Sequence, residues 1–460
     1  MYFTQYYLDC LSQASYMIAD ERTRRAVVVD PRRDVSEYLT DARAHGLTIE
    51  AVINTHFHAD FLAGHLELAE ATGAWIGYGQ RAEADYPIRK LVDGERVSLG
   101  DVTLRIMETP GHTPESISIE VFEHAEDVVP YGVLTGDALF IGDVGRPDLL
   151  SSIGVTADEL GRQLYHSIQR LMDLPDPVRV FPAHGAGSAC GKNLSTERTS
   201  TIGQQRAANY ACQPMTEDEF LAIVTEGQPS APSYFLHDAI LNRKEHQVFD
   251  PAKPPRPLEM DEVLDDELAG EVLLDVREPF EFAAGHLLGS INVPADGRFA
   301  ETAGMVVKPD QKVVVIAPQD REEEIVIRLA RIGFDNVVGY LREPEGAFLS
   351  TPERVARASR LTAVELAEAL ASGRPPVVVD VRNIGELAQG RIEGSLHIPL
   401  AELPRRMAEI PADRPVVVHC AGGYRSSVAA SVLRAAGRHD VSDLLGGYQA
   451  WAALQPQPVG

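Results

Sequence analysis

The sequence of 460 residues predicts an α/β protein with three domains: a layered α/β domain followed by two parallel α/β domains. Three observations lead to this prediction. Short β-branched runs alternate with helical apolar patterns along the chain. A proline-rich segment divides the chain near its middle, and two sequence blocks recur after it at a fixed offset. A typical domain size of about 150 residues agrees with this count.

The first domain, residues 1–248, combines two kinds of predicted strand. Apolar runs at 26–31 and 51–54 end in loops, as strands with both faces covered do. The alternating segments 96–107 and 116–121 are typical of antiparallel strands with one covered face. Helical patterns lie between these strands, at 35–44, 62–72 and 156–171. In such a layered arrangement we expect the chemistry to lie on loops at strand ends.

A linker is predicted at 249–258. This segment contains four prolines, which exclude a helix interior or a central strand. Proline-rich segments of this kind are stiff and extended. The linker therefore separates the first domain from the repeated part of the chain.

The chain repeats itself after the linker. The run Val272–Arg277 (VLLDVR) recurs 105 residues further on as VVVDVR, and Gly289–Pro294 (GSINVP) recurs at the same distance as GSLHIP. Each copy continues with a short β-branched strand, a loop and a helical stretch. Strands that alternate with helices at this spacing predict a parallel sheet. We therefore expect two related domains, at 259–355 and 356–460.

Composition excludes several classes of protein. The formal net charge of −26 leaves no basic face for the phosphates of a nucleic acid. No apolar run approaches the roughly 20 residues that cross a bilayer, and residues 1–20 show no secretory signal. Four cysteines are too few for a disulfide framework, so we expect thiols in a reducing, cytoplasmic setting. Assembly into a homo-oligomer is left open.

Polar side chains of metal-ligand type follow several predicted strands of the first domain. They are His56, His58, Asp60, His112, Asp137 and His184. Burial of these side chains without partners would cost several kcal/mol of folding free energy. A metal or a dense hydrogen-bond network must therefore compensate. Singly, the last three are ordinary turn residues. Together and in this order, the six predict a metal site.

This set resembles the metallo-β-lactamase superfamily, whose pattern is His-x-His-x-Asp-His, a Gly-His-Thr turn, an Asp and a final His. The resemblance covers roughly residues 1–240 and implies an αββα sandwich with the metal in loops at one edge. One position departs from the pattern, because Phe61 stands where the hydrolases have a histidine for a second metal. A phenyl ring cannot bind a metal. His56, His112 and Asp137 remain as a two-His-one-carboxylate set, which suits Fe(II) better than tetrahedral zinc.

The order and spacing are similar to those of the persulfide dioxygenase branch. That resemblance implies one Fe(II) per chain, a low-molecular-weight thiol persulfide and O2 as substrates, and sulfite with free thiol as products. His58, Asp60 and His184 would then orient the ligands or bind water and substrate. The alternative, a second metal held by Asp60, Asp137 and His184, stays open.

Two further residues of the first domain are candidates. Arg146 lies in a Gly-Arg-x-Asp stretch similar to a persulfide dioxygenase segment whose Arg anchors the carboxylate of the substrate; a pair with Asp148 is the alternative. Cys190 lies in a loop of small residues where glutathione-using members carry His-Asp-Tyr. Lys192 nearby would favour its thiolate and make it reactive, whereas a small buried apolar side chain is the alternative. The missing tyrosine disfavours glutathione persulfide and leaves other thiols open.

A candidate sulfur-transfer loop lies in the last domain. Cys420 follows a β-branched strand and precedes a helix, and the loop continues with Gly422, Gly423, Tyr424 and Arg425. Backbone N–H groups at such a turn lower the pKa of the thiol and bind an anion on its sulfur. The segment resembles the six-residue active loop of rhodaneses, and this resemblance covers roughly 358–460. It implies that Cys420 carries sulfane sulfur between a thiol persulfide, sulfite and thiosulfate, with the other four residues around the substrate.

The preceding copy lacks this chemistry. Ala317 stands where Cys420 stands in the last domain, and Glu322–Glu324 replace Arg425 and the two serines after it. Without a thiol there is no persulfide, and carboxylates repel anionic sulfur species. We therefore expect this copy to pack against the two active modules or to act as a spacer between them.

The favoured interpretation is a bifunctional sulfur-oxidising enzyme, in which Fe(II)- and O2-dependent persulfide oxidation is coupled to sulfur transfer at Cys420. The arrangement resembles bacterial fusions of a persulfide dioxygenase, a silent rhodanese and a working rhodanese. Two alternatives remain. One is a zinc-dependent thioester hydrolase similar to glyoxalase II, with rhodanese appendages. The other is a sulfur carrier or docking protein that uses Cys420 alone.

Overall fold

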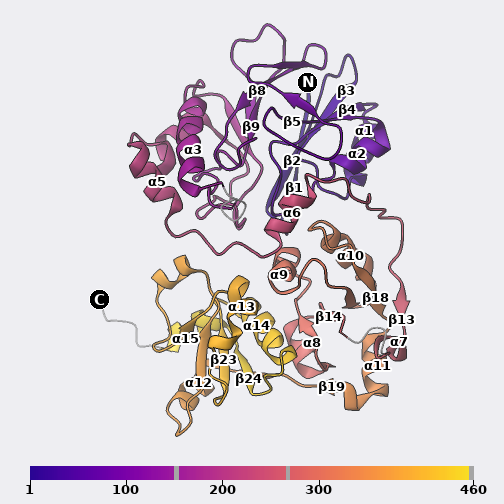
Figure 1. Ribbon diagram of the computed structural model, residues 1–460, viewed down its shortest axis with the longest axis vertical. Helices are drawn as coiled ribbons and strands as arrows, with labels where there is room; N and C mark the ends of the chain where they lie inside the picture. Colours follow the sequence, from indigo (N-terminus) through magenta and orange to yellow (C-terminus); the bar gives the residue numbers. More distant parts are fainter. Residues whose placement is uncertain (150–154, 266–269, 455–460) are drawn as a thin grey trace. The chain divides into compact units, whose positions relative to one another are not determined.

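The computed structural model describes residues 1–149, 155–265 and 270–454. Its contacts divide the chain into two compact units (Figure 1). The first unit contains Met1–Ala231 and Phe235–Pro251, together with Arg331–Gly333. The second contains the rest of the described chain. The finer boundaries expected from the sequence stay a prediction.

Within the described residues, the first unit contains two six-stranded sheets. The order of the first is β1-β2-β3-β4-β5-β6, with β1 Tyr2–Leu8, β2 Gln13–Ala19, β3 Arg25–Val29, β4 Thr48–Ile53, β5 Trp75–Gly79 and β6 Arg89–Leu91. The order of the second is β12-β11-β10-β9-β8-β7, with β7 Arg96–Ser98, β8 Thr103–Glu108, β9 Ile117–Phe122, β10 Gly132–Gly136, β11 Arg179–Pro182 and β12 Ser200–Thr201. The helices are α1 Ser36–Ala44, α2 His65–Thr72, α3 Ala157–Met172, α4 Ile202–Ala208, α5 Glu217–Thr225 and α6 Phe235–Leu241.

The two sheets face each other across one apolar core. Ile53 of β4 belongs to the same buried cluster as Leu104 of β8 and Leu134 of β10. Helices α1 and α2 pack on the outer face of the first sheet and α3 on that of the second. This is the αββα sandwich that the sequence led us to expect, and the α/β fold class is confirmed. The paired strands β7, β8 and β9 are antiparallel, as the alternating segments predicted.

Helix α3 shows how local sequence sets these elements. Thr156 caps it, since its side chain accepts a hydrogen bond from Glu159 N. Its buried side chains recur at helical spacing and face the second sheet, among them Leu164, Ile168 and Leu171. The expected helix at 156–171 is therefore confirmed.

The second unit contains two related parallel sheets among its described residues. The first has the order β13-β18-β17-β14-β16, with β13 Pro257–Leu258, β14 Val272–Asp275, β16 Ile291–Asn292, β17 Val313–Ile316 and β18 Val337–Leu341. The second has the order β20-β24-β23-β21-β22, with β20 Ser359–Leu361, β21 Val377–Asp380, β22 Leu396–His397, β23 Val416–His419 and β24 Val441–Leu444. The two orders correspond strand by strand, so the repeat seen in the sequence is a repeat of the fold. A short antiparallel pair accompanies them, β15 His286–Leu287 with β19 Val355–Ala356.

The helices of the second unit connect these strands. In the first copy they are α7 Met260–Val263, α8 Pro279–Ala284, α9 Phe299–Val306, α10 Glu322–Ala330 and α11 Pro344–Ser350. In the second they are α12 Ala363–Leu370, α13 Leu403–Arg406, α14 Tyr424–Ala435 and α15 Gly447–Leu454. Among all described helices, none has both the length and the apolarity that a bilayer crossing requires.

The repeated Asp-Val-Arg triplet is structural. Arg277 pairs with Asp275 at 2.6 Å, and Arg382 pairs with Asp380 at the same distance. Both pairs are buried, and each guanidinium also donates to a backbone carbonyl, Gly285 O or Gly390 O. A buried pair needs such additional hydrogen bonds to offset its desolvation. The triplet therefore fixes the loop after the strand in both copies, whether or not the copy carries a thiol.

Candidate metal centre and sulfur-transfer loop

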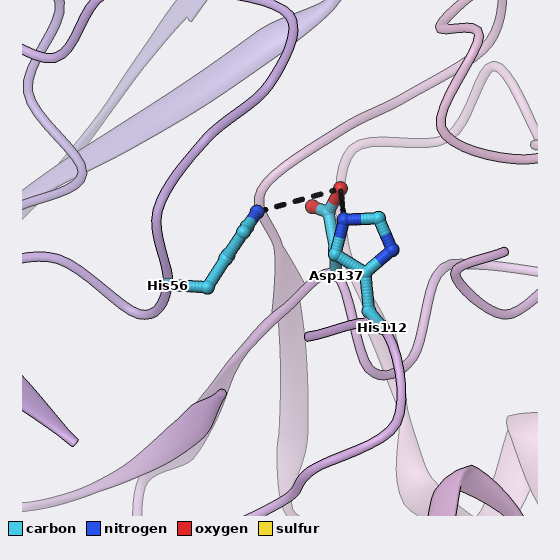
Figure 2. A group of neighbouring side chains, drawn as sticks. All are labelled: His56, His112 and Asp137. Carbon is cyan, nitrogen blue, oxygen red and sulfur yellow. Dashed lines mark ion pairs between the residues drawn. The ribbon is translucent and has the colours of Figure 1, made fainter. Parts of the chain in front are cut away.

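Three side chains from separate strand ends meet in the first unit (Figure 2). His56 follows β4, His112 follows β8 and Asp137 follows β10. Asp137 Oδ2 lies 3.9 Å from His56 Nε2 and 3.5 Å from His112 Nε2. All three side chains are buried. The structure thus brings together the three residues that the sequence predicted as metal ligands.

Their donor atoms fit a metal ion. His56 Nε2 and Asp137 Oδ2 are buried, and within the described residues neither has a hydrogen-bond partner. Unpaired buried polar atoms are costly, and a cation between them would remove that cost. Two imidazoles and one carboxylate are a common set for a divalent transition metal. The metal-binding role itself stays a prediction.

Hydrogen bonds orient both histidines as neutral ligands. Thr55 Oγ1 donates to Asp30 Oδ2 at 2.9 Å, so it can accept from His56 Nδ1 at 3.0 Å. His112 Nδ1 lies 2.9 Å from the carbonyl oxygen of Arg146, to which it must donate. The proton of each ring is therefore on Nδ1, and each Nε2 keeps its lone pair toward Asp137.

The electrostatics of the cluster agree with this assignment. Burial, with a smaller contribution from His58, holds the pKa of His56 well below its usual range. Burial alone would raise the pKa of Asp137, but His184 and His56 outweigh it and hold that pKa low. At neutral pH the imidazole of His56 is therefore neutral and the carboxyl group of Asp137 is ionised.

Asp30 is a site residue that the sequence reasoning missed. It follows β3 with a left-handed φ of 51°, and it accepts hydrogen bonds from Thr55 N and Thr55 Oγ1. His58 Nε2 also lies 3.0 Å from its Oδ1, so His58 turns toward Asp30. The acid directly after a run of valines was the only local signal. Asp30 holds the loop that carries His56.

A second group of potential ligands adjoins the first. Asp60, His184 and Cys190 each offer a donor atom within 4.8 Å of the others. His184 lies between two carboxylates, with Nδ1 2.8 Å from Asp137 Oδ1 and Nε2 2.8 Å from Asp60 Oδ2. Burial favours its neutral ring, yet Asp137 and Asp60 outweigh burial and hold the pKa of His184 well above its usual range. The second-metal alternative stays open.

The phenyl ring of Phe61 is fully buried beside both groups. Its centroid lies 4.2 Å from the ring of His58 and 6.4 Å from the ring of His184. An apolar ring, which offers no donor atom to a metal, therefore lies beside both groups of potential ligands.

The expectation that Lys192 activates Cys190 is wrong. Lys192 Nζ donates to the carbonyl oxygens of Ile223 and Glu226, so its charge does not face the thiol. Cys190 is 1% exposed, and burial followed by the charges of Asp60 and Asp137 raises its pKa well above the usual range. A reactive role for Cys190 stays a prediction, without the cation that motivated it.

Arg146 connects the metal-ligand cluster to the Cys190 loop. Its guanidinium pairs with both carboxylate oxygens of Asp148, each at 2.7 Å, and donates to Ala189 O and Pro229 O. Its backbone N donates to Cys190 O, and its carbonyl accepts from His112. Arg146 is buried, and its pair with Asp148 is the alternative that was considered from the sequence. Anchoring a substrate carboxylate stays a prediction, and it would require exchange with Asp148.

The Cys420 loop lies between β23 and α14 in the second unit. Gly423 has a φ of 110°, a conformation that favours glycine, and its N–H donates to Cys420 Sγ at 3.1 Å. Ser426 Oγ lies 3.6 Å from the sulfur, and the thiol is 2% exposed. Arg425 forms a two-pronged pair with Glu386, with both distances 2.7 Å. The sulfur therefore accepts from one backbone N–H and lies beside a hydroxyl that itself donates to Gly423 O, while Glu386 balances the charge of Arg425.

The silent copy contacts the helix that follows this loop. Asn292 of β16 accepts from Ser427 Oγ at 3.0 Å through Oδ1, and its N–H donates to Ser431 Oγ at 2.9 Å. Its Nδ2 donates to Asp275 O and Arg277 O. Asn292 is fully buried, so it connects the strand ends of the silent copy to α14.

Replacing Asn292 by alanine should therefore destabilise the second unit by about 2 to 4 kcal/mol, since two carbonyls and one hydroxyl lose a buried partner. We expect the rate of sulfur transfer from Cys420 to fall at least about threefold, because α14 loses a positioning contact. Thermal unfolding and persulfide transfer measure the two effects. The matched control is Asn336→Ala, at an exposed position of the same copy. Equal behaviour of the two variants would contradict the positioning role.

Comparisons with known proteins agree with this architecture. A metallo-beta-lactamase superfamily model matches residues 8–184, and a rhodanese-like domain model matches 259–343 and 362–454. A solved metallo-beta-lactamase from Staphylococcus aureus subsp. aureus COL is 32% identical with a TM-score of 0.68, covering 74% of this chain and 99% of that chain. The fold and the clustered potential ligands define an enzyme of the metallo-β-lactamase type, with an αββα sandwich. The chain belongs to the metallo-β-lactamase superfamily and carries two rhodanese-like domains.

Curated relatives cover parts of the chain. The mitochondrial persulfide dioxygenase ETHE1 of Homo sapiens is 29% identical over 192 residues, 40% of this chain and 68% of the relative. A hydroxyacylglutathione hydrolase of Gloeobacter violaceus is 33% identical over 174 residues, 37% of this chain and 62% of the relative. The chain spans little more than half the length of several other curated relatives.

Proposed function

We propose that the chain is a bifunctional enzyme of sulfur metabolism. Its first module oxidises a low-molecular-weight thiol persulfide to sulfite and thiol with Fe(II) and O2. Its last module transfers sulfane sulfur at Cys420, with thiosulfate formed or used. The observation that carries the proposal is the convergence of His56, His112 and Asp137 beside the phenyl ring of Phe61. The persulfide dioxygenase relative and the rhodanese-like domains support it.

Each residue of the first module has a defined task in this proposal. His56 Nε2, His112 Nε2 and Asp137 Oδ2 would hold the ion. A ferrous ion with open coordination positions supplies the redox chemistry that lets O2 react with a thiol persulfide. His184 engages Asp137 Oδ1, which leaves Oδ2 directed at the two imidazoles. Phe61 and Phe140, both fully buried, keep water from the surroundings of His184.

The two reactions are chemically complementary. In the first, RSSH, O2 and H2O give RSH and H2SO3, so the sulfane sulfur loses four electrons to O2. In the second, the terminal sulfur of a Cys420 persulfide passes to sulfite and gives thiosulfate and the Cys420 thiol. The product of the first module is thus an acceptor for the second.

A zinc-dependent thioester hydrolase is the second candidate. The hydroxyacylglutathione hydrolase relative favours it, and so does the group formed by Asp60, His184 and Cys190 beside the main cluster. That candidate needs two metals, whereas the proposal needs one. Metal stoichiometry therefore separates them.

The decisive measurement is the metal content of protein purified without oxygen, together with O2 uptake on addition of a thiol persulfide. We expect one iron per wild-type chain. In the variant Phe61→His an imidazole joins Asp60 and His184, so the stoichiometry should rise toward two. The matched control Phe61→Leu removes the ring without adding a donor and should stay at one. Two zinc ions per wild-type chain with thioester cleavage would overturn the proposal.

A further inference from the structure

A cavity of about 430 Å³ lies beside the Cys420 loop, within the second unit. One wall consists of the loop itself, with Gly422, Gly423 and Tyr424. The opposite wall comes from the silent copy, with Glu278, Phe280 and Asp296. The copy that lacks a thiol therefore forms part of the surroundings of the thiol of the other copy.

The contact between these walls is specific. Tyr424 Oη donates to the carbonyl oxygen of Pro294 at 3.0 Å, and Pro294 also lines the cavity. Gly423, on the loop side, donates its N–H to Cys420 Sγ at 3.1 Å. The peptide that forms the cavity wall thus directly contacts the sulfur. Gly423 therefore contacts both the cavity and the reacting sulfur.

Two cations near this cavity are balanced by acids. Arg360, which lines it, pairs with Asp443 at 2.9 Å, and Arg425 pairs with Glu386. These two pairs contribute no net charge.

One acid of the silent copy that lines the cavity is left without a cation. Arg321 lies 2.9 Å from Asp296 and 2.9 Å from Glu324. Arg328 also pairs with Glu324 and donates to the carbonyl oxygens of Ala295 and Gly297, so two cations balance these two carboxylates. Glu278, which lines the cavity, has no cationic partner in the described chain and carries the excess negative charge.

The apolar part of the cavity suits an organic molecule. Phe280 is 75% exposed although it is large and apolar, and it lines the cavity together with Tyr424. Exposed aromatic side chains beside a reactive loop offer contact area to a carbon skeleton. The unbalanced carboxylate of Glu278 beside them favours a cationic group on that skeleton over an anionic one.

We propose that this cavity binds the organic part of an acceptor thiol and selects thiols that carry an ammonium group over thiols that carry a carboxylate. The inference rests on the proposed sulfur transfer at Cys420 and assigns its acceptor class. It also gives the silent copy a role in specificity. Partly exposed charges of this kind change the ratio of rates by about three- to tenfold at low ionic strength.

The transfer step needs no further reagent. The thiolate of the acceptor, RS⁻, attacks the terminal sulfur of the Cys420 persulfide, Cys–S–SH. A new bond forms between the acceptor sulfur and the terminal sulfur, and the bond between Sγ and the terminal sulfur breaks. The electron pair leaves with Sγ, so the products are RS–SH and the Cys420 thiolate.

The test uses the full chain loaded with sulfur at Cys420 and three acceptors of similar size and different charge: cysteamine, 2-mercaptoethanol and 3-mercaptopropionate. Rates are compared between the wild type and the variant Glu278→Gln/Asp296→Asn, so that the intrinsic reactivity of each thiol cancels. We expect the variant to be about three- to tenfold slower with cysteamine and faster by a similar factor with 3-mercaptopropionate. With 2-mercaptoethanol the rate should be unchanged.

The variant Glu368→Gln serves as the control, because it removes an exposed acid of α12 that does not line the cavity. It should leave all three rates at their wild-type values. The effect of the double substitution on the transfer rates with the cationic and the anionic thiol should also become smaller in high salt. Equal rate changes for all three thiols, or none, would overturn the cavity proposal alone. Absence of transfer to every acceptor, sulfite included, would overturn the proposed sulfurtransferase together with it.

Discussion

The variant His112→Ala is expected to lose its iron and its persulfide-dependent O2 uptake, by more than about 100-fold, while sulfur transfer at Cys420 stays within twofold of the wild type. His112 contributes one of two imidazole donors to a three-residue ligand set. Mutation of residues that only support metal ligands already lowers metal affinity or activity about 10- to 100-fold. Loss of a ligand itself should therefore lower them further. Iron content, O2 uptake and persulfide transfer on the same preparation measure the three outcomes.

The matched control for this variant is His124→Ala. His124 is an exposed histidine of the same unit, so its loss should leave iron content and O2 uptake unchanged. Full O2 uptake by His112→Ala would contradict the metal assignment and would favour the sulfur-carrier alternative, in which Cys420 acts alone.

The variant Cys420→Ser should lose sulfur transfer by more than about 1000-fold, since no persulfide can form on a hydroxyl oxygen. Its O2 uptake with an added thiol persulfide should remain at the wild-type rate, because the two reactions use different residues. Transfer of sulfur to sulfite, followed as thiosulfate, gives the first readout, and an oxygen electrode gives the second.

Cys10→Ser is the control for the loss of a thiol. Cys10 is half-buried in the first unit and has no proposed part in the reaction, so both activities should persist. Residual transfer in Cys420→Ser that disappears only when Cys190 is also replaced would instead assign sulfur transfer to Cys190. It would overturn the role proposed for Cys420.

Much of the fold could be predicted from the sequence, because its signals are local. Hydrophobic periodicity along 26–31 and 156–171 depends on neighbours in the chain, and the structure confirms a strand and a helix there. The repeated blocks predicted two equivalent parallel sheets for the same reason. His56, His112 and Asp137 could be proposed together because all three follow strands.

The partners of polar side chains were predicted less well. Lys192 is only two residues from Cys190, yet its ammonium group bonds to carbonyl oxygens elsewhere in the fold. Arg425 is close to Cys420 in sequence, and Glu386 neutralises it from another loop. Closeness along the chain does not determine which way a long flexible side chain points.

The sequence by itself determined the order of the domains, the class of each sheet, the absence of a thiol at Ala317 and the types of donor available to a metal. Only the tertiary structure decided that Asp30 supports the His56 loop and that acids of the silent copy lie beside the Cys420 loop. The physical reason is the separation along the chain over which each interaction acts. Periodicity and turn chemistry act over a few residues, whereas a hydrogen bond or a cavity requires that segments far apart in the chain meet.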